Sequence, residues 1–218
     1  MRGGQGQFIT FEGPEGSGKT TQSERLAERL TAEGIPVLRT REPGGTATGE
    51  YIREILQHGR SGETLFAETE LLLFSASRAQ LVHQVIRPAL ARGQWVLCDR
   101  FFDSTTAYQA YGHGLDVDKV EIIHGFAVGP TIPRRTFFLN LAVTESLRRM
   151  HLRNAERQTA PDRFEREEIA FHERVYAGYQ ALARRNPDRI RIIDATRTEA
   201  QVAERIWEEL DDVRTGTG

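Results

Sequence analysis

The segment Gly13-Pro14-Glu15-Gly16-Ser17-Gly18-Lys19-Thr20 decides the fold, because it matches the Gly-x-x-x-x-Gly-Lys-Thr pattern of a phosphate-binding loop. It follows residues 7–12, which have the apolar composition of a buried strand. It precedes residues 20–33, where Leu26 and Leu30 recur at helical spacing. A strand before the glycines and a helix after them is the context in which this pattern binds phosphate.

Each part of this loop has a task that its chemistry explains. The glycines leave backbone N–H groups free to surround phosphate oxygens, and the start of the helix adds the positive end of its dipole. Lys19 is expected to reach the β and γ phosphates of ATP, and the Thr20 hydroxyl to ligate Mg²⁺. Asp99, at the end of another predicted strand, is suited to hold the same ion directly or through water, or else to cap a helix.

The rest of the chain alternates between strand and helix patterns. We predict four further strands, at residues 36–40, 95–98, 136–141 and 190–193, and helices between them. The predicted helices span residues 49–58, 67–91 with an interruption near Pro88, 104–111, 117–128, 143–153, 165–185 and 199–213. This order predicts an α/β fold, a five-stranded parallel sheet flanked by helices, with ligands bound beyond the carboxyl ends of the strands. Residues 1–218 contain no repeat or interdomain linker, so we expect a single domain.

Composition excludes several classes of protein. A hydrophobic fraction of 39% without a bilayer-length apolar run argues against a membrane protein, and a net charge of −2 argues against bulk nucleic-acid binding. The one cysteine, Cys98, excludes an internal disulfide and is expected to fill a buried strand. Residues 1–7 lack a signal-peptide core, so the cytoplasm is the expected compartment. Of 29 basic residues only Lys19 and Lys119 are lysine, which sets Lys19 apart.

Three more motifs follow the loop in order: Thr-Arg-Glu-Pro-Gly-Gly-Thr at residues 40–46, Leu-Phe-Ser-Ala-Ser-Arg at 73–78 and Asp-Arg-Phe-Phe-Asp-Ser-Thr-Thr-Ala-Tyr-Gln at 99–109. Together with the loop they closely resemble thymidylate kinases, from about residue 8 to residue 207. The resemblance implies transfer of the γ-phosphate of ATP to dTMP, giving dTDP and ADP in dTTP synthesis. A guanylate or adenylate kinase would share only the loop and the nucleoside monophosphate kinase architecture.

The acceptor phosphate needs planar cationic donors near the strand ends. Arg41, Arg53 and Arg100 have this chemistry, and the resemblance implies that they grip the phosphate of dTMP. Arg53 alone could equally belong to a solvated helix face.

The resemblance also assigns the base and sugar contacts. Phe74 would stack on thymine, and Arg78, four residues further on the same helix face, would bind the base edge. Without the resemblance, Phe74 and Tyr108 would both be read as core. The remaining implied contacts are Pro43 near the thymine methyl, Gln109 at the base edge with Ser104 or Thr105 nearby, and Tyr108 under the deoxyribose.

A polar segment at about residues 149–165 resembles the lid that closes over ATP in the family. Members place a catalytic arginine either in the loop or in the lid, and here Gly16 follows Glu15, so the lid must supply it. Arg153 and Arg157 are the candidates, although some lid arginines would belong to a solvated face. Glu15 is implied to contact the acceptor sugar hydroxyl and the water around magnesium, and Arg197 to line the adenine pocket.

Alternatives stay open at this stage. Another deoxynucleotide kinase, or a deoxynucleoside kinase, would share the loop, although the second would not need the three phosphate-binding arginines. A nucleotide-dependent switch protein would need an Asn-Lys-x-Asp motif, whereas Asp118 precedes Lys119. The resemblance further implies a homodimer with residues 67–91 at its interface. The chain departs from the family pattern at Pro133-Arg134-Arg135 and at Asn140.

Overall fold

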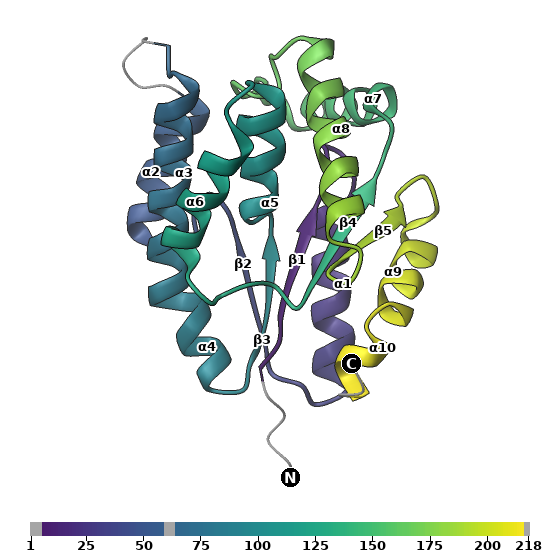
Figure 1. Cartoon of the computed structure of the whole chain (residues 1–218). Coiled ribbons are helices and arrows are strands. Elements are labelled where there is room, and N and C mark those ends of the chain that lie inside the picture. The colour runs from purple at the N-terminus through teal and green to yellow at the C-terminus, as the bar shows by residue number, and fades with distance from the viewer. Residues whose placement is uncertain (1–5, 59–63, 216–218) are drawn as a thin grey trace.

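A parallel sheet forms the centre of the computed structural model, which describes residues 6–58 and 64–215 (Figure 1). Its strands are β1 (Phe8–Glu12), β2 (Val37–Arg41), β3 (Trp95–Asp99), β4 (Arg135–Asn140) and β5 (Ile190–Asp194), in the order β2-β3-β1-β4-β5. All neighbouring strands pair in parallel. The predicted fold class is therefore confirmed, and every strand lies within one residue of its predicted bounds.

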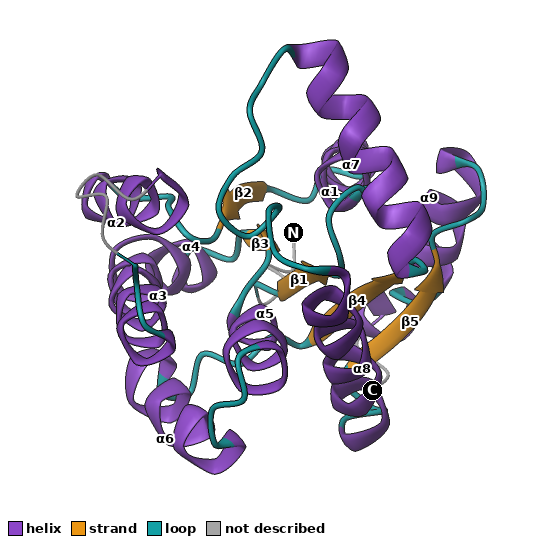
Figure 2. Ribbon diagram, turned by 90° about the horizontal axis from the view of Figure 1, so that it is seen from above, coloured by secondary structure: helices purple, strands orange, loops and turns teal. Residues whose placement is uncertain are grey.

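Helices cover both faces of this sheet (Figures 1 and 2). Residues of β1 and β4 pack on one face against α1 (Lys19–Ala32) and α9 (Glu199–Glu208). The other face is covered by the run from α3 (Ala67–Leu81) to α4 (Arg87–Ala91), by α6 (Val117–Val128) and by α8 (Ile169–Arg185). The other helices are α2 (Ala47–His58), α5 (Phe102–Thr105), α7 (Val143–Arg157) and α10 (Asp211–Thr215).

Two helical runs widen into π-helical turns. Residues 67–91 continue through η1 (Val82–Ile86), which lies directly before α4, where Pro88 sits in the first turn. Proline is tolerated there because an N–H in the first turn has no intrahelical partner. The predicted interruption is thus a wide turn within a continuous run. In the same way α5 continues into η2 (Thr106–Gly112), so the predicted helix at 104–111 is extended at both ends.

The largest differences from the predicted helices lie in the second half of the chain. The helix α7 runs on to Arg157, four residues beyond the predicted end, because its polar last turn lies on an exposed face and needs no core contact. The helix α8 begins at Ile169 and not at Glu165, since the Glu165 carboxylate binds back to the side chains of Arg153 and Asn154. The predicted helix at 199–213 is divided into α9 and α10.

The departures from the family pattern make structural contacts. Arg135 is buried, and its guanidinium binds the Asp212 carboxylate and, at 2.8 Å, the carbonyl of Asp188. The Asn140 side chain accepts a hydrogen bond from Gln180 Nε2 at 3.0 Å. These substitutions therefore tie β4 to the C-terminal helix and to α8.

Cys98 is fully buried in β3, as expected for strand filler. Within residues 6–58 and 64–215, none of the helices has the length and apolar character needed to cross a membrane.

We predict that Gly178→Ala destabilises the fold, because α8 approaches η2 closely at this residue. A Cβ atom at Gly178 would lie 2.8 Å from both Cβ and Cγ of Tyr111. Such overpacking costs about 1–3 kcal/mol. Chemical denaturation should show the loss. Ala177→Ser, one residue away and exposed, is the control and should change the free energy of unfolding by less than about 0.5 kcal/mol. Equal stabilities of the two variants would show that the helices can separate without penalty.

Candidate active site

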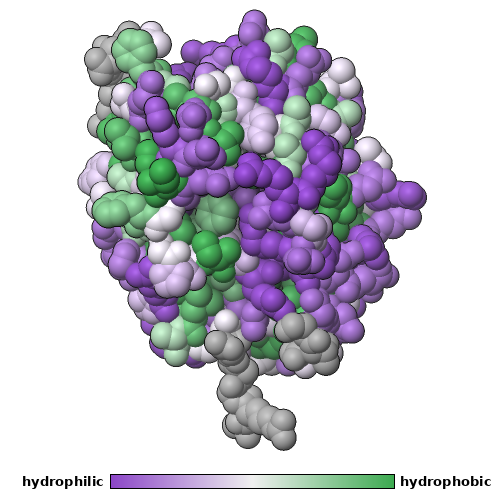
Figure 3. All heavy atoms as spheres, viewed as in Figure 1, coloured by the Kyte–Doolittle hydropathy of each residue, from purple (hydrophilic) through white to green (hydrophobic). Residues whose placement is uncertain are grey.

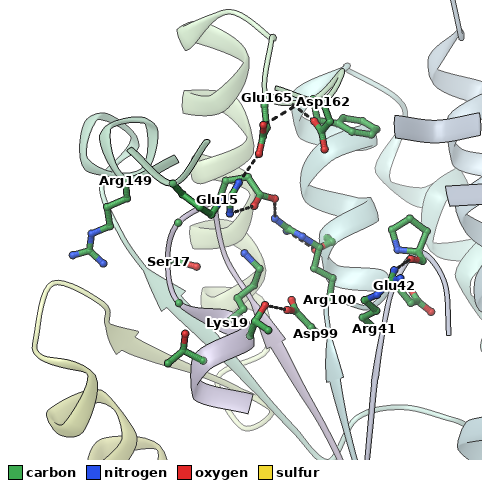
Figure 4. Close-up of a pocket in the computed structure, with 18 of the residues that line it drawn as sticks. Glu15, Ser17, Lys19, Arg41, Glu42, Asp99, Arg100, Arg149, Asp162 and Glu165 are labelled. Atoms are coloured by element: carbon green, nitrogen blue, oxygen red, sulfur yellow. Dashed lines mark hydrogen bonds and ion pairs between the residues drawn. The ribbon is translucent and has the colours of Figure 1, made fainter. Parts of the chain in front are cut away.

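A cleft of about 930 Å³ opens at the carboxyl edge of the sheet. It brings together segments that are far apart in the sequence: the loop after β1, the ends of β2 and β3, the α3 and η2 helices, and residues 149–165 (Figure 4). Most of the predicted site residues line it, namely Glu15, Gly16, Ser17, Gly18, Lys19, Thr20, Arg41, Pro43, Arg53, Phe74, Arg78, Asp99, Arg100, Ser104, Thr105, Tyr108, Gln109, Arg153, Arg157 and Arg197.

The loop closes around its own lysine. Lys19 Nζ donates to the carbonyls of Gly13 and Pro14, at 3.1 and 2.8 Å, so these two residues support the loop although they do not line the cleft. Gly13 and Gly18 have φ values of 138° and 93°, a region that favours glycine. Burial, reinforced by the positive charge of Arg100, lowers the pKa of Lys19 to about 8.

A hydroxyl and a carboxylate meet beside the loop. Thr20 Oγ1 donates to Asp99 Oδ2 at 2.6 Å (Figure 4). Both are hard oxygen ligands of the kind that Mg²⁺ prefers. Within the described residues no group of three or more His, Cys, Asp or Glu side chains could hold a metal. A hydroxyl and one carboxylate would leave most of the coordination positions of such an ion to water and phosphate.

Arg100 joins the loop to the other side of the cleft. Its backbone has a φ of 67°, which turns the chain sharply after Asp99. Its guanidinium donates to the carbonyl of Gly13 at 3.0 Å and to Tyr179 OH at 3.1 Å, and it forms an ion pair with Glu15 (Figure 4). Burial opposes ionisation of Glu15, but Arg100 and Lys19 outweigh it and hold the pKa of this carboxyl well below its usual range.

Glu12 holds two of the hydroxyl groups that contact Arg100. It is fully buried at the end of β1, and its carboxylate accepts hydrogen bonds from the backbone N–H of Phe101 at 2.7 Å, from Ser104 Oγ and from Tyr179 OH. Burial, with the nearby Asp103, raises the pKa of Glu12 to about 7. The sequence motifs assigned no role to Glu12 or to Tyr179. A glutamate ending an apolar strand was the only signal for the first, and Tyr179 carried none beyond helical spacing.

Two arginines converge on the turn after β2. Arg41 Nη1 and Arg53 Nη1 donate to the carbonyl of Pro43, at 2.8 and 3.1 Å, and Arg41 also pairs with Glu50. Arg53 is half-buried and lines the cleft, so its side chain does not lie on a solvated helix face. Burial, together with the charge of Arg41, lowers the pKa of Arg53.

Arg78 is buried, with only 1% of its side chain exposed. Its Nε donates to Glu42 Oε2 and its Nη2 to Thr105 Oγ1, both at 2.8 Å. Burial raises the pKa of Glu42 to about 7, against the opposing effect of Arg78. Arg78 is therefore fixed in the wall of the cleft, and removing it would leave Glu42 without its cationic partner.

The structure separates the four arginines of the 149–165 segment. Arg149 binds Glu145 and the carbonyl of Ala195, on the opposite side of the loop from Arg100 (Figure 4). Arg153 Nη2 donates to Glu165 Oε1 at 2.6 Å, while its Nη1 lies 3.6 Å from Glu15 Oε2. Arg163 turns to Glu70 on α3. Arg157 lines the cleft, and its side chain makes no hydrogen bond or ion pair with any residue that the structure describes.

Aromatic rings gather near the end of this segment. Phe164, which sequence reasoning did not single out, has its ring centroid 5.9 Å from that of Phe74 and 6.0 Å from that of Tyr108. All three rings line the cleft. Arg197 lies at the rim, largely exposed, and pairs with Asp194 at 3.1 Å.

Comparisons with known proteins agree with this geometry. A family model described as thymidylate kinase matches residues 11–206. A thymidylate kinase of Synechococcus sp. strain JA-3-3Ab is 50% identical over 200 residues, covering 92% of this chain and 93% of the relative. One of Thermomicrobium roseum is 50% identical over 206 residues, covering 94% and 95%.

A solved structure gives the same result in three dimensions. The crystal structure of thymidylate kinase from Ehrlichia chaffeensis matches with a TM-score of 0.74 at 33% identity, covering 94% of this chain and 99% of that one. The similarity thus extends over sequence, fold and nearly the full length of each relative, and this chain belongs to the thymidylate kinase family.

Proposed function

We propose that this protein transfers the γ-phosphate of ATP to dTMP, giving dTDP and ADP in dTTP synthesis. The observation that carries the proposal is the position of Arg100, which contacts the phosphate loop through Gly13 and Glu15 and lines the cleft together with Arg41 and Arg53. A donor loop and a cluster of arginines in one cleft suit a phosphorylated acceptor. A deoxynucleoside kinase has no acceptor phosphate for these arginines to bind.

On the donor side, the loop from Gly13 to Thr20 binds the phosphates of ATP through its backbone N–H groups, and Lys19 neutralises the β and γ phosphates. Thr20 and Asp99 are the residues that would hold Mg²⁺, directly or through water. When bound, Mg²⁺ would supply positive charge that offsets the charge developing on the phosphates. Arg197, at the rim, lines the adenine pocket.

On the acceptor side, Arg41, Arg53 and Arg100 bind the dTMP phosphate, and Glu15 orients the acceptor sugar next to the loop. Phe74 stacks on thymine and Arg78, held by Glu42 and Thr105, donates to its edge. The other acceptor contacts are those of Pro43, Ser104, Thr105, Tyr108 and Gln109.

We assign the segment at about residues 149–165 as the lid of a single domain formed by residues 1–218. Of its two candidate arginines, Arg157 has no side-chain partner in the described part of the chain and can meet the transferring phosphoryl group, whereas Arg153 lies beside Glu15 and Glu165. Both add positive charge where negative charge spreads in the transition state.

We also propose that the protein acts as a homodimer in the cytoplasm, with no nucleic-acid or membrane partner. Large apolar side chains are exposed on α3 and α6, including Leu72, Ile122 and Phe126, which is 94% exposed. In Figure 3 hydrophobic residues gather on the side of the molecule that α2, α3 and α6 occupy. A second copy that covers this face would remove these side chains from water.

We expect Lys19→Ala to leave a folded protein whose dTMP-dependent ADP production is reduced more than about a hundredfold, since a lost transition-state charge contact costs on the order of 3 kcal/mol. The measurement is a coupled assay of ADP release with dTMP, dCMP, AMP, GMP and thymidine as acceptors. Lys119→Ala removes the only other lysine and should match the wild type. Near-normal turnover in Lys19→Ala, or a wild type that prefers thymidine or another monophosphate, would contradict the proposal.

We predict that replacing Arg153 and Arg157 together by alanine lowers kcat much more than it weakens dTMP binding, because their contact with the transferring group matures in the transition state. Steady-state kinetics and equilibrium binding of dTMP separate the two effects. Arg166→Ala, directly after this segment and outside the cleft, is the control. An unchanged kcat in the double variant would place the catalytic charge elsewhere.

A further inference from the structure

Glu70 is a buried carboxylate that the reaction described above does not use. It lies one turn before Phe74 on α3, and its side chain is 1% exposed. Its Oε2 accepts a hydrogen bond from Gln109 Nε2 at 3.0 Å and lies 3.4 Å from His113 Nε2, while its Oε1 pairs with Arg163. Burial opposes its ionisation, but these His113 and Arg163 contacts hold the pKa of Glu70 below its usual range.

An ionised carboxylate can only accept hydrogen bonds, and this fixes the amide of Gln109. The NH₂ group must face Glu70, so Oε1 is the end that remains. Gln109 is fully buried, and its Oε1 has no hydrogen-bond partner among the described residues. A buried acceptor without a partner is costly. Gln109 lines the cleft beside Phe74 and Thr105, so its free acceptor belongs to the part of the cleft assigned to the base.

Pyrimidine bases differ at the atom that such an acceptor would meet. The N3 position of thymine and uracil carries a hydrogen and donates, whereas N3 of cytosine is an acceptor. A glutamine whose side-chain amide could rotate by half a turn would bind either base, cytosine through its NH₂ group or thymine through its oxygen. A glutamine whose NH₂ group is held by a carboxylate can bind only the donor.

We infer that Glu70 is a positioning residue for base selection, which orients the Gln109 amide so that Oε1 accepts from the N3–H of the acceptor base and rejects a base without that hydrogen. This inference rests on the proposed function, because it takes a pyrimidine monophosphate as the acceptor. Arg78 presents only N–H donors, so it can bind the O4 acceptor of thymine but not the amino group that cytosine carries there. The Gln109 contact would add a second discrimination between the two bases, at N3.

The contact with Arg163 helps to keep the Glu70 carboxylate ionised. Arg163 Nε donates to the carbonyl of Leu56 at 3.2 Å, so the guanidinium is held at the end of α2 next to Glu70. A cation fixed beside Glu70 keeps the carboxylate ionised and therefore unable to donate to Gln109. The lid segment thus supports the orientation of a residue that reads the base.

The test is the ratio of kcat/KM for dTMP to kcat/KM for dCMP in Glu70→Gln. A neutral amide at residue 70 can donate as well as accept, so the side-chain amide of Gln109 becomes free to rotate by half a turn. The ratio should narrow by about tenfold or more, through weaker use of dTMP and better use of dCMP. The ratio of dTMP to dUMP, which both carry N3–H, should stay within about twofold. An unchanged dTMP to dCMP ratio in a folded variant overturns the inference.

A double-mutant cycle shows whether Glu70 acts through Gln109. Gln109→Leu removes the amide and should itself narrow the dTMP to dCMP ratio. Adding Glu70→Gln in that background should then change the ratio no further. If the dTMP to dCMP ratio narrows further in the double variant, Glu70 does not act through Gln109 and has only a structural role. Even if Glu70→Gln does not fold, an unchanged dTMP to dCMP ratio in Gln109→Leu overturns the inference.

Failure of this inference is distinguishable from failure of the proposed function. If the wild type does not phosphorylate dTMP, the proposed function fails. If it does so with its ratios unaffected by either substitution, only the role of Glu70 fails.

Discussion

The site depends on the contacts of the Arg100 guanidinium, because this group connects the phosphate loop with the opposite part of the cleft. It binds the carbonyl of Gly13 and the carboxylate of Glu15 in the loop, and the hydroxyls of Ser104 on α5 and Tyr179 on α8. The contacts with Gly13, Glu15 and Tyr179 each fix the relative position of two segments that are far apart in the sequence. Arg100 can do this only because the chain turns sharply after β3, at a positive φ.

A buried charge needs partners, and this requirement explains the layer of polar residues beneath the cleft. Glu12 holds the N–H of Phe101 and the hydroxyls that meet Arg100, while Asp103 forms a two-point ion pair with Arg189. Removing one member of such a pair leaves an uncompensated charge in the interior. The buried ion pairs that position the site residues therefore also stabilise the fold. The effect of a substitution at the site on activity needs a parallel measurement of the free energy of unfolding.

The sequence was sufficient to predict the sheet and the strand-end residues, because in a parallel α/β fold the ligand-binding residues follow the strands. Lys19, Thr20, Asp99 and Arg100 all lie where this rule places them. Helix ends near residues 149–165 were less predictable. The helix predicted from Glu165 begins only at Ile169, because the Glu165 side chain contacts Arg153 and Asn154 in the folded chain.

Residues inside helices were the hardest to recognise. Tyr179 and Glu70 stand in patterns that look like ordinary packing or an ordinary polar face, and their importance comes from partners 79 and 39 residues away. For the same reason the sequence does not distinguish the four arginines of residues 149–165: three of them pair with carboxylates in the folded chain, and Arg157 has no such partner among the described residues. Sequence motifs indicate which chemistry is present, and tertiary contacts decide which copy of a residue type performs it.

The central claim is that the arginine cluster around Arg100 binds a phosphorylated acceptor next to the donor loop. Calorimetric titration of the protein with dTMP and with thymidine tests it most directly, because the two ligands differ only in the phosphate. Two to three charge-assisted contacts predict that dTMP binds at least about a hundredfold more tightly than thymidine, and that Arg100→Met removes most of this difference. Equal affinities for dTMP and thymidine in the wild type would contradict the account.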